Sequence, residues 1–332
     1  MKDNMRRLPL FSLIAACSVS LTAAGLAFPL NEKKAPENQA DILEIQKALL
    51  EAIPKAKAAT VCIDLGDGTG SGVIVSADGL VMTAAHVSTG VGKEITVIMP
   101  DGKKMDGETL GLMAEFDAAL VRITGEKPVG GFPFVEINRT GDTKLGDWIF
   151  SLGHSGGFDK DRGAVARLGR LVRVANTTIQ TDGTLIGGDS GGPLFDMEGR
   201  LIGIHSRVGP QLPVNMHVPV KVFLDGWDSM MKSEFVGEGP YAQLPEKGKG
   251  FLGVATKDVE GGLEVTKVGN KSPAEEAGLK EGDVIRSLNG ESLSDREKLK
   301  AILAELAAGD KLELEITRDG KNETIKMRLG AR

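Results

Sequence analysis

Aromatic residues and cysteine are scarce in this 332-residue chain. Phe, Trp and Tyr together make up 4% of the residues, and the only cysteines are Cys17 and Cys62. If Cys17 is lost with a processed N-terminus, no internal disulfide can form. Cys62 lies in the β-prone run Val61-Cys62-Ile63. We therefore expect it to be a small buried hydrophobic residue and not a nucleophile.

Positive charge is also in short supply. The chain has 40 Lys and Arg residues against 46 Asp and Glu residues, a formal net charge of −6, and no cluster that resembles a polybasic patch. This balance argues against nucleic acid as the main partner. A hydrophobic content of 41% is enough for globular cores. The length suggests two domains.

The first 27 residues have the pattern of a targeting segment. Lys2, Arg6 and Arg7 precede an apolar stretch that runs from Leu8 to about Leu30. Gly25-Leu26-Ala27 offers a small-x-small cleavage site. Residues 1–27 are therefore predicted to be a signal peptide or a membrane anchor.

Three versions of this N-terminus stay open. The segment is cleaved after Ala27, or it stays as an anchor, since it approaches the ~20 residues that span a bilayer. Alternatively, Ile14-Ala15-Ala16-Cys17 is a lipobox and Cys17 carries a lipid. All three predict an exported protein of the periplasm or cell envelope.

Gly188-Asp189-Ser190-Gly191-Gly192-Pro193 is the most informative stretch. Its glycines allow a tight turn that exposes a serine hydroxyl, because glycine tolerates positive φ. A serine is a weak nucleophile unless a base takes its proton. It also needs backbone N–H groups aimed at the developing oxyanion. We expect this oxyanion hole within Gly188, Asp189 and Ser190, with the N–H groups of Gly188 and Ser190 as donors.

A base and its orienting carboxylate are available upstream. His86, one of only four histidines, follows the apolar run Gly79–Met82, and Asp117 opens a buried strand. A buried aspartate needs a partner, which His86 would supply. The order His, Asp, Ser is that of chymotrypsin-type double barrels. Each residue taken alone has a structural alternative: His86 is a core histidine, Asp117 a strand-end cap and Ser190 a turn serine.

Together these motifs carry a family resemblance. Thr83-Ala84-Ala85-His86, Phe116-Asp117-Ala118-Ala119-Leu120 and the Ser190 turn resemble the three catalytic motifs of trypsin-like serine proteases. With Gly70-Ser71-Gly72-Val73-Ile74-Val75 and the C-terminal region, roughly residues 55–330 resemble the HtrA (Deg) family. The resemblance implies a mainly β, chymotrypsin-like double β-barrel. It also implies His86 as base, Asp117 as its orienter, Ser190 as nucleophile, and no metal or cofactor.

Asp189 departs from this family, which usually has asparagine there. In digestive proteases an aspartate at this position pairs with a new N-terminus made by zymogen cleavage. No such cleavage motif is evident in this sequence. We therefore expect Asp189 to be a loop residue that bonds to backbone.

The substrate pocket is predicted from the resemblance alone. It is expected to hold Thr184, Leu185, Ser206, Arg207, Val208 and Asn215. An apolar floor suggests small or medium aliphatic side chains at the cleavage site. Arg207 and Asn215 weaken that inference.

The C-terminal region resembles a PDZ domain. Its signature is Ser272-Pro273-Ala274-Glu275-Glu276-Ala277-Gly278-Leu279, followed by Gly282-Asp283-Val284-Ile285. PDZ domains add an extended peptide to a sheet edge. The residues expected to contact that peptide are Gly250, Phe251, Leu252, Gly253 and Val254, with the amides of the 250–253 loop on its C-terminal carboxylate. The alternative is that Phe251 and Leu252 only fill the core.

These observations give a domain layout. Residues 1–27 form the targeting segment, and 28–57 an N-terminal segment with a short helix over Asp41–Ile53 that Pro54 ends. Residues 58–232 form the trypsin-like domain, 233–249 the linker and 250–332 an α+β PDZ domain.

The layout predicts an envelope serine endopeptidase that cleaves unfolded or damaged proteins, with C-terminal peptides as PDZ ligands. Family resemblance implies a homo-oligomer, commonly a trimer. Two other functions stay open. One is a PDZ-based binding or chaperone protein with a vestigial protease domain. The other is a membrane-anchored regulatory protease with one dedicated substrate.

Overall fold

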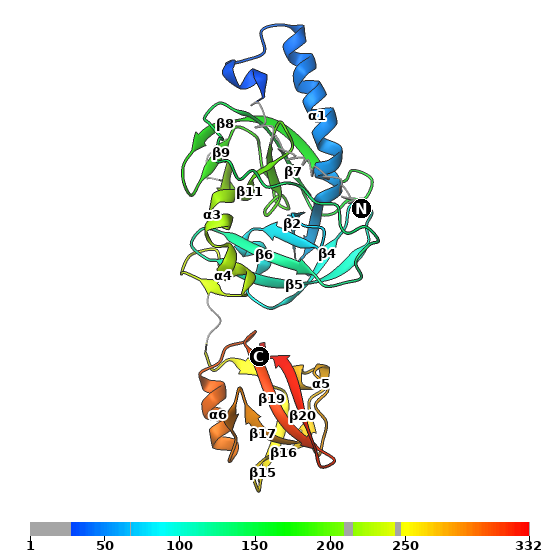
Figure 1. The fold of residues 1–332 in the computed structure, drawn as a ribbon, viewed down its shortest axis with the longest axis vertical. Helices are drawn as coiled ribbons and strands as arrows, with labels where there is room; N and C mark the ends of the chain where they lie inside the picture. The colour runs from blue at the N-terminus through cyan, green and yellow to red at the C-terminus, as the bar shows by residue number, and fades with distance from the viewer. Residues whose placement is uncertain (1–27, 67, 209–214, 243–246, 332) are drawn as a thin grey trace, which may run out of the picture.

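The computed structural model describes residues 28–66, 68–208, 215–242 and 247–331 (Figure 1). The targeting segment expected over residues 1–27 lies outside this range. Among the described residues, no helix is both long and apolar enough to cross a membrane.

The first half of the protease region is a closed antiparallel barrel. Its strands run in the order β5-β4-β1-β2-β3-β6, and β5 pairs with β6 to close it. Val61, Val73, Val81 and Leu120 are fully buried in this half of the core. The strands are β1 (Thr60–Asp64), β2 (Thr69–Ile74), β3 (Leu80–Thr83), β4 (Glu94–Ile98), β5 (Lys104–Met113) and β6 (Ala118–Ile123).

The second half is another closed barrel, in the order β10-β11-β12-β9-β8-β7. Phe150 and Phe195 stack in its interior with ring centroids 4.9 Å apart. The double barrel predicted from the order of the motifs is confirmed. Its strands are β7 (Trp148–Gly153), β8 (Val165–Val174), β9 (Ile179–Thr181), β10 (Pro193–Asp196), β11 (Leu201–Val208) and β12 (Asn215–Pro219).

The N-terminal helix is longer than expected. After the 3-10 turn η1 (Pro29–Glu32), α1 covers Gln39–Ala59 and stands beside both barrels (Figure 1). The prediction that Pro54 ends this helix is wrong. Ala52, Ala56 and Ala59 are buried against the core on both sides of the proline. Leu50, whose carbonyl loses its helical donor, is exposed, so packing outweighs that loss.

The protease region continues past the expected boundary at residue 232. After α2 (Ala85–Ser88) in the first barrel, two short helices follow the second: α3 (Val220–Asp225) and α4 (Trp227–Met231). The chain then returns to the first barrel, where β13 (Phe235–Val236) pairs in parallel with β5. This strand lies inside the stretch that composition assigned to the linker.

The C-terminal domain is a small α+β unit. Its sheet has the order β15-β16-β17-β19-β20, so β15 is an edge strand. Ser272 caps α5 as predicted, because its Oγ accepts a hydrogen bond from Glu275 N. The elements are β14 (Gly250–Phe251), β15 (Val254–Val259), β16 (Gly262–Val268), α5 (Pro273–Glu276), β17 (Val284–Leu288), β18 (Glu291–Ser292), α6 (Arg296–Ala304), β19 (Lys311–Arg318), β20 (Lys321–Arg328) and β21 (Gly330–Ala331).

Candidate active site

His86 and Asp117 lie in direct contact. His86 is on α2, directly after β3, and Asp117 is the residue before β6, the partner strand of β3. His86 Nδ1 is 2.9 Å from Asp117 Oδ1 and 3.0 Å from Oδ2. His86 N also donates to Oδ1 at 3.1 Å. Nδ1 is therefore the protonated nitrogen, which leaves Nε2 free to accept a proton.

The Asp117 carboxylate is held rigidly. It is fully buried, and its backbone has a φ of 62°, a left-handed value that few non-glycine residues adopt. Ser206 Oγ donates to Oδ2 at 2.5 Å. The sequence placed Ser206 in the substrate pocket, whereas the structure uses its hydroxyl to support Asp117.

The Ser190 turn abuts the residue that follows His86. A Cβ on Gly70 would lie 2.6 Å from Val87 Cγ1 and 3.2 Å from Ser190 O. Val87 and Ser190 therefore both lie against Gly70. Ser71 N donates to Ser190 O at 2.7 Å. Within the described residues no hydrogen bond joins Ser190 Oγ to His86. Such contacts are often long in ligand-free enzymes and tighten on substrate binding.

Two backbone donors in the Ser190 turn are unused. Neither Gly188 N nor Ser190 N has an acceptor among the described residues. Gly188 has a φ of 91°, and a Cβ there would lie 2.3 Å from His154 O, so only glycine fits. Asp189 N, by contrast, donates to Ile186 O at 3.1 Å. Of the three residues expected in the oxyanion hole, Gly188 and Ser190 thus offer free N–H groups and Asp189 does not.

The carboxylate of Asp189 bonds to backbone as expected, because Oδ2 accepts from Ile186 N at 2.9 Å. It also makes contacts that the sequence did not suggest. Arg167 Nη2 lies 3.0 Å from Oδ2, and Ser155 Oγ donates to Oδ1 at 2.6 Å. Neither Arg167 nor Ser155 belongs to a recognisable motif, and only the strand register brings them here.

The expected pocket residues fall into two groups. Leu185 N donates to Asn215 Oδ1 at 2.9 Å, so the segment before the nucleophile and the start of β12 form adjoining walls. Asn215 is buried, and its Nδ2 has no partner among the described residues. Thr184, Val208 and Arg207 are exposed. The Arg207 guanidinium lies 5.3 Å from the centre of the Tyr241 ring.

A buried histidine pair packs behind the Ser190 turn. His205 O accepts from Gly191 N at 2.8 Å. The Nδ1 atoms of His205 and His217 are 2.9 Å apart, and His205 Nε2 lies 3.1 Å from Leu152 O. Burial lowers the pKa of His205 to about 3 and that of His217 well below its ordinary value. Both rings are therefore neutral.

Cys62 has the surroundings expected of a structural residue. Its side chain is fully buried in β1, and burial raises the pKa of the thiol to about 11. A thiol with so high a pKa is protonated near neutral pH, so it is a poor nucleophile.

The expected peptide-binding loop of the C-terminal domain also has unused donors. Leu252 N and Gly253 N make no hydrogen bond with the described residues. Leu252 is nonetheless buried in the core, and Gly253 has a φ of 88°. Gly250 and Phe251 pair with β21. Val254 opens the edge strand β15, and α6 contacts both β14 and β15.

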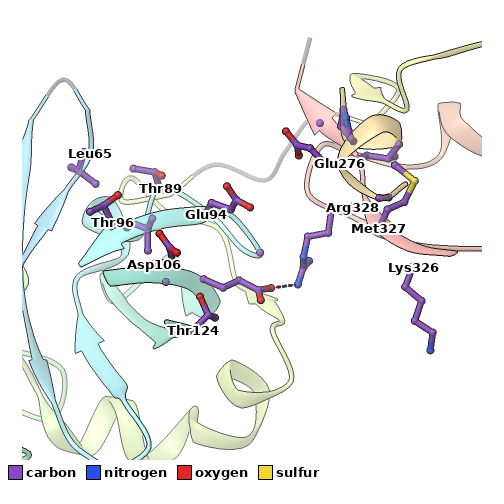
Figure 2. A pocket seen from close by; sticks show the side chains of 18 of the residues that line it. Leu65, Thr89, Glu94, Thr96, Asp106, Thr124, Glu276, Lys326, Met327 and Arg328 are labelled. Atoms are coloured by element: carbon purple, nitrogen blue, oxygen red, sulfur yellow. Dashed lines mark hydrogen bonds and ion pairs between the residues drawn. The ribbon is translucent and has the colours of Figure 1, made fainter. Parts of the chain in front are cut away.

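A separate cleft lies between β5 and the C-terminal domain. Its volume is about 1000 Å³, and none of the expected catalytic residues lines it. Figure 2 shows acidic side chains from both sides and one ion pair across it, between Arg328 on β20 and Glu108 on β5 at 2.5 Å.

Comparison with known proteins identifies two domains in this chain. A family model described as a trypsin-like peptidase domain matches residues 70–204, and a PDZ domain model matches residues 250–329. The chain is thus a trypsin-like serine peptidase domain followed by one PDZ domain.

Curated proteins similar to this chain are named as serine endoproteases. A "Probable periplasmic serine endoprotease DegP-like" of Pseudomonas fluorescens is 32% identical over 282 residues, covering 79% of this chain and 56% of the relative. A protein of the same name from Marinomonas sp. is 32% identical over 283 residues, covering 79% of this chain and 57% of the relative. The names of these relatives and the two matched domains bear out the resemblance of the motifs to the HtrA (Deg) family. It spans a little over half the length of these relatives.

Two solved structures resemble the chain. The serine endoprotease from Yersinia pestis has a TM-score of 0.49 and 21% identity, covering 90% of this chain and 99% of that one. The structure described as "HtrA-type protease AlgW with decapeptide" has a TM-score of 0.48 and 23% identity, covering 85% of this chain and 98% of that one.

Proposed function

We propose that this protein is a serine endopeptidase that cleaves unfolded or damaged polypeptides in the periplasm or cell envelope. The observation that carries the proposal is the bond from His86 Nδ1 to the buried Asp117 carboxylate, beside a turn with two free N–H groups. The relatives are named as probable periplasmic serine endoproteases, which supports this compartment.

The proposed reaction uses only side chains and backbone of this chain. Ser190 Oγ attacks the peptide carbonyl while His86 Nε2 takes its proton. Asp117 holds the ring in the required tautomer and stabilises the imidazolium that forms. The N–H groups of Gly188 and Ser190 stabilise the oxyanion. His86 then protonates the leaving amine and activates the water that hydrolyses the acyl-enzyme.

An extended, unfolded substrate suits the accessible parts of this site. The wall formed by Leu185 and Asn215 has one apolar side chain and one amide donor, Asn215 Nδ2, without a partner among the described residues. We therefore expect small or medium side chains at the cleavage site. Folded proteins do not present such segments to a strand-accepting cleft.

The C-terminal domain is proposed to bind C-terminal peptides. The edge strand β15 provides unpaired backbone groups, and the free N–H groups of Leu252 and Gly253 suit a carboxylate. A homo-oligomer, commonly a trimer in this family, and membrane attachment through residues 1–27 also belong to the proposal.

Digestion of casein tests the proposed activity. Purified wild type is compared with Ser190→Ala and with Ser294→Ala, an exposed serine of the C-terminal domain. We expect cleavage by wild type and Ser294→Ala but not by Ser190→Ala. Sequencing the products gives the side-chain preference, and clustering after Lys or Arg would contradict the apolar pocket.

A casein-binding assay, N-terminal sequencing and a wider panel of substrates separate the alternatives. Binding of casein without hydrolysis, undiminished by Ser190→Ala, would favour a binding protein with a vestigial protease domain. An intact N-terminus with a narrow set of cleaved proteins would favour an anchored regulatory protease.

A further inference from the structure

The Asp189 carboxylate sits in a closed polar triangle beneath the Ser190 turn. Asp189 is fully buried, and Arg167 is only 17% exposed. Ser155 Oγ donates to Asp189 at 2.6 Å and accepts from Arg167 Nη2 at 2.7 Å, while Arg167 pairs directly with Asp189. A buried carboxylate is costly unless paired and hydrogen-bonded, and this triangle meets both conditions.

Arg167 reaches this position from the second barrel. It lies on β8, in register with Ser151 of β7, the strand that leads into the 154–157 loop containing Ser155. Among the described residues, Arg167 is the only cationic side chain that forms an ion pair with Asp189. Its guanidinium therefore supplies, from within the fold, the positive charge that the turn needs.

The same loop fixes the orientation of an oxyanion donor. Gly156 N donates to Gly187 O at 2.7 Å. In a trans peptide the carbonyl and the following N–H point in opposite directions, so holding Gly187 O also directs Gly188 N. The Asp189 carboxylate holds the other side of the turn through Ile186 N.

We propose that Arg167 is a positioning residue whose ion pair with Asp189 keeps Gly188 N aimed into the oxyanion hole without any newly cleaved N-terminus. This inference rests on the proposed function. It accounts for the aspartate at a position where the family usually has asparagine, because an aspartate here requires a cation and Arg167 provides it.

A charge-removal series tests the proposal on a peptide substrate taken from the casein digest. Arg167→Met leaves a buried carboxylate unpaired, and we expect kcat to fall about 10²-fold, the usual loss for an oxyanion donor, with KM little changed. Arg167→Met/Asp189→Asn removes both charges while the amide oxygen can still accept from Ile186 N. We expect this double variant to recover kcat to within about tenfold of wild type.

Controls separate this role from general stability. Arg173→Met removes an exposed arginine from the same strand and should leave kcat unchanged. Thermal melts show whether Arg167→Met remains folded, and the neutral double variant keeps the test valid if it does not. Unchanged kcat in Arg167→Met, or a double variant no better than Arg167→Met, would overturn the proposal.

Hydrogen exchange adds a readout that does not depend on catalysis. We expect faster exchange of the 184–190 amides in Arg167→Met than in wild type or Arg173→Met, because the Asp189 carboxylate that accepts from Ile186 N loses its ion pair. Equal exchange rates in wild type, Arg167→Met and Arg173→Met would contradict the inference. If wild type fails to cleave casein while this exchange difference appears, the proposed function fails and the positioning contact stands.

Discussion

Ser206 Oγ donates to Asp117 Oδ2 at 2.5 Å, from a strand of the second barrel to the residue that opens the last strand of the first. The carboxylate that orients His86 therefore depends on both barrels. The site is assembled at their interface, and neither barrel contains it alone.

Ser206→Ala should impair catalysis moderately. A hydrogen bond to a charged group is worth about 1.5–3 kcal/mol, but His86 still donates twice to Asp117. We expect kcat/KM to fall about tenfold on a peptide substrate, with Ser206→Thr near wild type because it keeps the hydroxyl. Full activity in Ser206→Ala would show that this bond does not orient the carboxylate.

Asp117→Asn should be far more damaging. An amide can donate to Nδ1 and so stabilise the wrong histidine tautomer, which in enzymes of this class lowers kcat by about 10⁴-fold. We expect KM to change little, since Asp117 is buried away from substrate. Steady-state kinetics with a sensitive fluorogenic peptide would measure kcat and KM separately. A loss of less than tenfold in kcat would contradict the role of Asp117 in orienting His86.

Acid should destabilise the protein through its buried histidines. The folded-state pKa values of His205 and His217 are lowered, whereas unfolded histidine titrates near 6.5. The unfolded state thus binds more protons, and stability falls as pH drops from about 6.5 toward 3, by up to ~1.4 kcal/mol per pH unit for each ring. His154, whose pKa burial also lowers, adds to this trend.

Denaturant melts at pH 7.5 and pH 5.5 check this prediction. We expect wild type to lose several kcal/mol between the two values. His217→Gln should be less stable at pH 7.5 and should lose less on acidification. Identical pH dependence in the two proteins would mean that His217 is not kept neutral by the fold.

Gly253→Ala should disable the C-terminal domain. Gly253 has a φ of 88°, and an added Cβ would lie 2.3 Å from Ser272 Cβ, the residue that caps α5. We expect loss of peptide binding and a lower melting temperature for this domain. Gly320→Ala is the matched control, since it also has positive φ but open space around its Cβ position. Peptide binding by fluorescence anisotropy compares the two variants.

Pro54→Ala should stabilise the protein. Pro54 lies inside α1, is exposed, and removes one helical hydrogen bond. Alanine restores the donor, and we expect a gain of about 1–3 kcal/mol in the free energy of unfolding. Chemical denaturation measures it. A loss of stability would indicate that the proline makes a contact the helix needs.

The candidate catalytic residues could be picked out from the sequence because each one sits in a short local motif. The residues around His86, Asp117 and Ser190 encode a strand end, a strand start and a glycine turn. Their order in the chain then fixes the fold. The strands of the C-terminal domain were predictable for a similar reason, since turn residues such as Asp319-Gly320 lie between alternating apolar runs.

What the sequence could not reveal depends on contacts between distant segments. Arg167 and Asp189 lie 22 positions apart in the chain, and the pairing of β7 with both β8 and β10 brings them together. The pairing of β13 with β5 was hidden in the same way, in a stretch whose composition resembles a linker. The prediction at Pro54 failed for the opposite reason. Proline usually ends a helix, but here burial of Ala52, Ala56 and Ala59 keeps the helix continuous through it.

Tyr241 and Ala242 still pack against the protease region, so the chain leaves that region at Ala242 and not at β13. Seven residues (243–249) then lead to β14, the first strand of the PDZ domain, and they can span at most about 25 Å. A polypeptide held by the PDZ domain is therefore confined near the first barrel. Over such a reach the effective local concentration is on the order of millimolar. Even a substrate that binds the catalytic cleft weakly would occupy it while its C-terminus is held.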